Sequence, residues 1–121
     1  MPKDSFLVNR IKSIGFAFRG AYLLIKTEAS IKIQVAIAIM VTIAGFYYNI
    51  SETEWIIQIF AIGLVMGIEG ANTAIEKICD YIQPEFDPKI GFIKDIAAGA
   101  VMLVSIASSI IGLIIYIPKI F

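Results

Sequence analysis

The chain has 121 residues, of which 59% are hydrophobic and only 17% are charged, and its ten basic residues balance its ten acidic ones. A soluble domain carries roughly 25% charged residues, so this composition argues against a soluble enzyme and favours one small membrane-embedded domain. The single cysteine, Cys79, excludes an intrachain disulfide. Because the chain has no histidine, any acid–base or metal chemistry falls to carboxylates, which bind hard cations such as Mg²⁺.

The N-terminal segment, residues 5–27, has the pattern of an amphipathic helix. Its apolar residues recur at steps of three and four, while Lys12, Arg19 and Lys26 recur every seven residues on another face. A helix of this kind lies in the plane of a membrane interface. We therefore predict an interfacial helix whose basic face contacts anionic lipid, the phosphates of a nucleotide, or both.

Three membrane-spanning helices are expected after this segment, over residues 31–50, 55–82 and 95–117. The first and third contain uncharged runs of 19 and 23 residues, and about 20 residues cross a bilayer. The middle run is uncharged only from Trp55 to Ile68, which is too short, so its helix must continue into the polar residues that follow. All four prolines lie outside these predicted helices, as expected if none is broken.

The basic residues predict the orientation of the chain. Nine of the ten precede the first span or lie between the second and third, and only Lys119 follows the third. Basic residues favour the cytoplasmic side of a membrane. We therefore expect a cytoplasmic N-terminus, a cytoplasmic loop over residues 77–95 and a C-terminus outside.

A polar stripe marks the point where the middle span turns polar. At about 100° per residue, Glu69, Asn72, Glu76 and Asp80 share one face of a helix, and an ionisable residue at the edge of a span indicates a functional site. Glu76 lies roughly 10.5 Å beyond Glu69 along the axis, nearer to water.

This separation suits two different roles. The deeper carboxylate can accept a proton from a hydroxyl at headgroup depth, and the outer one can hold Mg²⁺ on a polyphosphate. Glu28 and the pair Lys94 and Asp95 precede the first and third spans, so they reach a similar depth. Together these groups predict phosphoryl transfer where cytosol meets lipid.

Two motifs carry a family resemblance. The sequence Glu69-Gly-Ala-Asn-Thr-Ala-Ile-Glu76, followed by Lys94-Asp95-Ile-Ala-Ala-Gly-Ala-Val101, resembles the signature of the small prokaryotic diacylglycerol kinases, a family that includes undecaprenol kinases. The resemblance covers nearly the whole chain. It implies an all-α homotrimer of three-span subunits in the bacterial inner membrane, each with an interfacial N-terminal helix. It also implies that MgATP phosphorylates a membrane lipid alcohol at cytoplasmic sites between subunits.

The resemblance implies a role for each matching residue. Glu69 would be the general base, with Asn72 and Lys94 as further catalytic groups. Glu28 and Glu76 would bind the metal and ATP. The other nucleotide-binding positions would be Lys12, Glu85, Phe86, Asp87, Lys94 and Asp95. The chain departs from the family pattern at Arg10, Gln34 and Asp87.

Several alternatives stay open at this point. A small proton-coupled transporter using Glu69 would also need an intramembrane carboxylate, and a non-catalytic membrane subunit is a further class. Glu69 could instead form a buried structural pair with Lys94. For the lipid, the sequence Lys26-Thr27-Glu28 and the C-terminal ending resemble the undecaprenol-kinase branch, which slightly favours undecaprenol over diacylglycerol.

Overall fold

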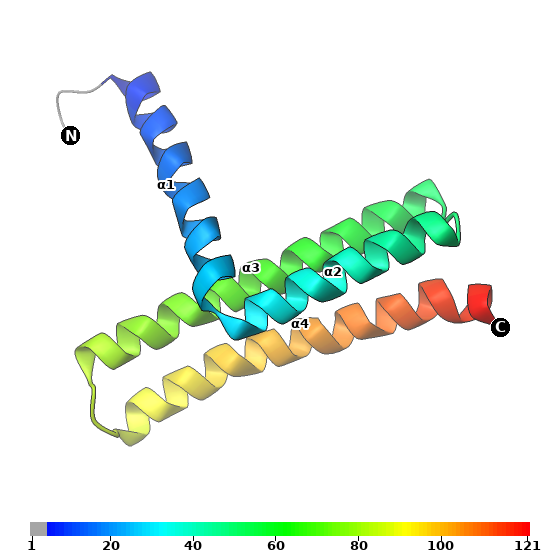
Figure 1. Cartoon of the computed structure of the whole chain (residues 1–121). Coiled ribbons are helices and arrows are strands. Elements are labelled where there is room, and N and C mark those ends of the chain that lie inside the picture. The colour runs from blue at the N-terminus through cyan, green and yellow to red at the C-terminus, as the bar shows by residue number, and fades with distance from the viewer. Residues whose placement is uncertain (1–4) are drawn as a thin grey trace.

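The computed structural model describes residues 5–121, and this part of the chain forms four α-helices joined by short connections. They are α1 (Phe6–Thr27), α2 (Ala29–Tyr47), α3 (Glu52–Ile82) and α4 (Pro88–Ile120). Helices α2, α3 and α4 lie side by side as a bundle, whereas α1 leaves the bundle at a steep angle (Figure 1). The expected all-α class is confirmed.

Three of these helices, α2, α3 and α4, are long and apolar enough to cross a membrane, as predicted. Few of their apolar side chains are buried, and most of the large ones are exposed. Such a surface suits helices that contact lipid tails or other helices rather than water. The buried polar side chains of the described residues all lie on α3, and they are Gln58, Glu69, Asn72 and Thr73.

A sharp corner separates α1 from α2. Ser5 begins α1 by accepting a hydrogen bond from the Val8 N–H at 3.2 Å. The helix ends at Thr27 because Glu28 takes an extended backbone conformation, with φ −102° and ψ 118°, and α2 then begins at Ala29. Glu28 therefore sits at the corner between a helix that leaves the bundle and one that belongs to it.

The turn between α2 and α3 is tightly packed. Asn49 has a φ of 51°, which asparagine tolerates better than most residues. Ser51 and Glu54 then form a capping box that starts α3 at Glu52, earlier than the predicted 55. A Cβ on Gly45 would lie only 2.6 Å from the Trp55 ring. The close approach of α2 and α3 at this point therefore needs a residue without a side chain.

Helix α4 begins at Pro88 rather than at the predicted residue 95. The Asp87 carboxylate accepts hydrogen bonds from the Lys89 N–H at 2.8 Å and the Ile90 N–H at 3.4 Å, and proline suits the first helical position because its missing N–H would have no partner there. The expectation that every proline lies outside the helices is also wrong for Pro88, the first residue of α4, and for Pro118, which lies inside its last turn. There it removes only one hydrogen bond close to the helix end.

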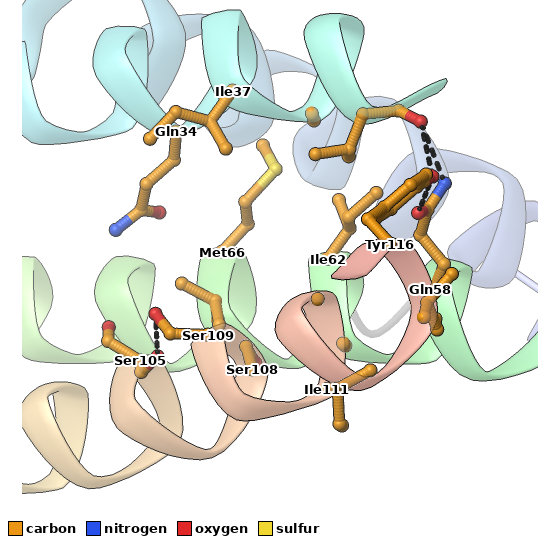
Figure 2. Close-up of a pocket in the computed structure, with 16 residues that line it drawn as sticks. Gln34, Ile37, Gln58, Ile62, Met66, Ser105, Ser108, Ser109, Ile111 and Tyr116 are labelled. Carbon is orange, nitrogen blue, oxygen red and sulfur yellow. Dashed lines mark hydrogen bonds between the residues drawn. The ribbon is translucent and has the colours of Figure 1, made fainter. Parts of the chain in front are cut away.

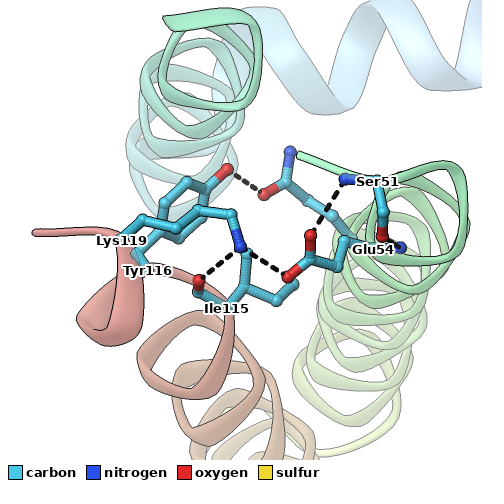
Figure 3. A network of polar contacts seen from close by, with 6 residues as sticks. Ser51, Glu54, Ile115, Tyr116 and Lys119 are labelled. Atoms are coloured by element: carbon cyan, nitrogen blue, oxygen red, sulfur yellow. Dashed lines mark hydrogen bonds and ion pairs between the residues drawn. The ribbon is translucent and has the colours of Figure 1, made fainter. Parts of the chain in front are cut away.

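A network of polar contacts joins α3 to α4 beside the α2–α3 turn (Figure 3). The Lys119 ammonium donates to Glu54 at 2.8 Å, and the same carboxylate accepts from the Ser51 N–H at 2.9 Å. Nearby, the Tyr116 hydroxyl donates to the Gln58 side-chain oxygen at 2.5 Å. We call this region the turn end of the bundle, and the region where α1 meets α2 and α3 the site end.

Candidate active site

The carboxylate of Glu69 is buried at the site end, where α3 faces the start of α2. Glu69 is only 7% exposed. Its Oε1 accepts a hydrogen bond from the Ser30 hydroxyl at 2.7 Å. The last turn of α1 also comes close, because Leu24 lies 3.0 Å from where a Cβ on Gly70 would be. Sequence reasoning missed Ser30, although its position two residues after Glu28 was a usable signal.

One turn further along α3, Asn72 and Glu76 form a bonded pair. The Asn72 amide nitrogen donates to Glu76 Oε1 at 3.0 Å. Asn72 is 7% exposed, and its side-chain oxygen Oδ1 is buried without a hydrogen-bond partner. An unpaired buried acceptor costs about 1–3 kcal/mol of stability. This oxygen is therefore available to accept a hydrogen bond from a ligand or to bind a cation.

The corner residue Glu28 lies alongside the same part of α3. Its Oε1 is 3.4 Å from the ammonium of Lys77, the residue after Glu76. The fold therefore draws Glu28 towards the polar stripe although it is far from that stripe in sequence.

Lys94 also reaches the stripe, at its far end. Its ammonium donates to Asp80 Oδ1 at 2.6 Å. The alternative of a buried Glu69–Lys94 pair is therefore wrong, because Glu69 is bonded by Ser30 and Lys94 by Asp80. The turn between α3 and α4 places Lys94 beside Asp80, which caused this difference.

The remaining predicted nucleotide-binding residues lie further away or at the surface. Glu85 and Phe86 are exposed in the α3–α4 connection, Asp87 caps α4, and Asp95 is exposed on its second turn. Lys12 lies on α1, 16 residues before Glu28, which is roughly 24 Å along a helix. Because α1 leads away from the bundle (Figure 1), one chain alone does not bring Lys12 to the stripe.

The stripe has the oxygen donors that a hard cation needs, although not a complete cage. Within residues 5–121, no group of three or more carboxylate, thiol or imidazole side chains is placed to hold a metal ion. Mg²⁺ in phosphoryl-transfer sites is usually held by one or two carboxylates, with waters and substrate phosphates completing its shell. The Glu76 carboxylate beside the unpaired Asn72 Oδ1 fits such a partial donor set.

Comparison with known proteins identifies the family. The model of the family described as prokaryotic diacylglycerol kinase matches residues 15–116. An undecaprenol kinase from Bacillus subtilis is 40% identical over 108 residues, which cover 89% of this chain and 88% of that protein. A diacylglycerol kinase from Escherichia coli K12 is 25% identical over 100 residues, covering 83% and 82%, and one from Haemophilus influenzae is 27% identical over 114 residues, covering 94% of each chain.

The chain therefore belongs to the prokaryotic diacylglycerol kinase family. The recognition made from its two motifs is confirmed, and so is its assignment as a lipid kinase. This membership favours the kinase over the transporter and the non-catalytic subunit.

Proposed function

We propose that this lipid kinase transfers the γ-phosphate of ATP, with Mg²⁺, to the hydroxyl of a membrane lipid alcohol at the cytoplasmic face of the inner membrane. The observation that carries the proposal is the arrangement at the site end: a buried Glu69 oriented by Ser30, and about two turns away a Glu76 carboxylate beside an unpaired amide oxygen. Glu69 lies nearer the apolar part of α3, and Glu76 lies nearer its polar end.

Glu69 is the proposed general base. Ser30 bonds Oε1, which leaves Oε2 to accept the proton of the lipid hydroxyl as that O–H bond breaks. The freed oxygen forms a bond to the γ-phosphorus, and the bond between that phosphorus and the β-γ bridging oxygen breaks, so the electron pair leaves on ADP. The low exposure of Glu69 keeps water from competing with the lipid for the phosphoryl group.

The nucleotide side of the site is assigned to the more polar residues. Glu76 and Glu28 would hold Mg²⁺, which supplies positive charge to the phosphate oxygens when bound. Asn72 orients Glu76 through its amide nitrogen, and its free oxygen is placed for a donor or the cation. The other proposed nucleotide-binding residues are Lys94, Asp95, Glu85, Phe86, Asp87 and Lys12.

We further propose a homotrimer with α1 at the membrane interface. Support comes from α1 itself, which has no buried residue and leaves the bundle at a steep angle (Figure 1). A neighbouring subunit would also bring Lys12 towards a site that its own chain does not reach. A C-terminal reporter that is active only in the cytoplasm, or a monomer with full activity, would contradict this arrangement.

Undecaprenol is the proposed better substrate, with diacylglycerol also phosphorylated. The support is the 40% identity to an undecaprenol kinase, against 25–27% to diacylglycerol kinases. The test is transfer of labelled γ-phosphate from ATP to each lipid by the purified protein in the same nanodiscs, with and without a Mg²⁺ chelator. No transfer to any lipid alcohol would refute the kinase reaction, whereas a kcat/KM about ten times higher for diacylglycerol would overturn only the lipid preference.

A further inference from the structure

A cavity of about 410 Å³ lies between α2, α3 and α4, and it extends from Gln34 and Met66, about one turn short of Glu69, to the turn end. Figure 2 shows Gln34 at one end of this space and the bonded pair of Gln58 and Tyr116 at the other. Its walls between these ends are largely apolar, with Ile37 from α2, Ile62 from α3 and Ile111 from α4. The cavity therefore has an apolar middle and two polar ends.

The cavity follows the same face of α3 that carries the candidate active site. Gln58 and Glu69 are eleven residues apart, so they differ by about 20° around the helix and by roughly 16 Å along it. Ala61 and Val65 line the cavity on this face between them. A molecule with its hydroxyl at Glu69 would therefore have its next atoms directed into the cavity.

The mouth of the cavity offers an unmet acceptor beside the site. Gln34 lies one turn beyond Ser30 on α2, and its side-chain oxygen is buried without a hydrogen-bond partner. Ser30 bonds Glu69, so the Gln34 oxygen is a separate acceptor at the end of the cavity nearer to Glu69.

The opposite end is closed by a set of bonds in which each group has a partner. The Tyr116 hydroxyl donates to Gln58 Oε1, and the Gln58 amide nitrogen donates to the Val41 carbonyl at 3.2 Å. The same hydroxyl lies 2.9 Å from the Val41 carbonyl, which ties α4 to α2. A hydrocarbon chain cannot form hydrogen bonds, so its entry among these polar groups would break their bonds without replacing them.

The length of the cavity suits a short hydrocarbon chain. The cavity spans α3 from Gln58 to Met66, about 12 Å along the axis. A single extended carbon chain advances about 1.2 Å per bond, one third of the extended length of a residue. Roughly 13 bonds, or about three isoprene units, therefore reach from Glu69 to Gln58.

We propose that this cavity holds the part of the substrate's hydrocarbon chain nearest its hydroxyl, and that Gly112 and the Gln58–Tyr116 pair set which chains the enzyme accepts. The inference rests on the proposed lipid-alcohol kinase activity. Gly112 keeps the cavity open, because it lines the space and a Cβ placed on it would meet no atom within 4 Å. The Gln58–Tyr116 pair stops the chain, and the remainder of a long lipid must leave between α2 and α4.

The test compares prenyl alcohols of one to four isoprene units with diacylglycerols of increasing acyl length, all in the same detergent micelles. For the unchanged enzyme, kcat/KM rises up to three isoprene units and is level from three to four. In Gly112→Leu, the new side chain fills the cavity without a backbone clash, so kcat/KM for the three- and four-unit alcohols falls by about tenfold while the one-unit alcohol is unaffected. Retained activity on the one-unit alcohol shows that the variant is folded.

The matched control is Gly63→Leu, because a Cβ there also meets nothing within 4 Å and Gly63 does not line the cavity. Its chain-length series should equal that of the unchanged enzyme. Tyr116→Ala should extend the rise of kcat/KM to the four-unit alcohol by opening the closed end.

Three results would overturn the inference. The first is a Gly112→Leu enzyme whose kcat/KM varies with chain length as in the unchanged enzyme. The second is a Gly112→Leu enzyme whose kcat/KM falls equally for all chain lengths and whose oligomer is lost in native mass spectrometry, which would assign the cavity to a second copy. The third is a Tyr116→Ala series that stays level beyond three units. By contrast, failure of the unchanged enzyme to phosphorylate any lipid in either series would refute the proposed function itself.

Discussion

The two ends of the bundle differ in how completely their buried polar groups are bonded. At the turn end, Glu54 accepts from both Lys119 and Ser51, and Tyr116 and Gln58 bond each other (Figure 3). At the site end, buried side-chain oxygens of Asn72 and Gln34 have no hydrogen-bond partner. Buried oxygens without hydrogen-bond partners lower stability. Their presence at the site end indicates that bound substrates supply the missing partners there.

The same comparison separates two uses of glutamate on one helix. Glu54 caps α3 and holds α4, so its carboxylate is fully engaged. Glu69 has one oxygen bonded to Ser30, which leaves the other for chemistry. Charge alone does not distinguish the two residues, and the predictions below use their different partners to test the contrast.

The largest effect is expected from Glu69→Gln. Removing the base while keeping side-chain volume should lower kcat by roughly 10²–10⁴ with little change in MgATP affinity. Glu54→Gln is the matched control, because it makes the same chemical change at the turn end of α3 and should leave kcat unaltered. The measurement is steady-state phosphoryl transfer with both substrates varied. Similar losses of kcat in both variants would show that the two glutamates do not differ in role.

Glu76→Gln should have the next largest effect, on the nucleotide side. Loss of its charge beside Asn72 should weaken MgATP binding by roughly 10–100-fold, and higher Mg²⁺ should rescue part of the loss. Glu28→Gln should behave similarly. Isothermal titration with a non-hydrolysable ATP analogue measures the affinity. If Glu76→Gln leaves nucleotide binding intact while Glu69→Gln abolishes it, the two roles are reversed.

A change at the turn end should affect stability and spare catalysis. Gly45→Ala places a Cβ 2.6 Å from the Trp55 ring, and such overpacking costs about 1–3 kcal/mol. Gly63→Ala is the control, since its Cβ meets no atom within 4 Å and alanine favours the helix by up to about 1 kcal/mol. Thermal unfolding in one detergent compares the two variants. Equal unfolding temperatures would contradict close packing at the turn.

The smallest effect is expected from Lys119→Met. The Lys119–Glu54 ion pair is partly solvent-exposed, with side chains 25% and 27% accessible, and pairs of this kind contribute little to stability. The unfolding temperature should fall slightly, and less at high salt because ions screen the pair. A loss of kcat in this variant would show that the turn end is coupled to catalysis.

Much of this protein follows from its sequence alone. The apolar runs predict three spans because backbone groups in lipid must be bonded within helices. The spacing of Glu69, Asn72 and Glu76 puts them on one face because a helix repeats every 3.6 residues, and the motifs around them identified the family. Helix ends were harder to predict, because caps such as Asp87 start a helix before the uncharged run begins.

Only the tertiary structure decided which groups from different helices meet. The Ser30–Glu69 and Lys94–Asp80 contacts depend on the corner at Glu28 and on the turn before α4, and hydropathy patterns carry no record of either. The cavity likewise arises because α2 and α4 both pack on α3 and are tied to each other by Tyr116. Periodicity tells which face of a helix a residue occupies, whereas its neighbour depends on how the helices are turned and packed against one another.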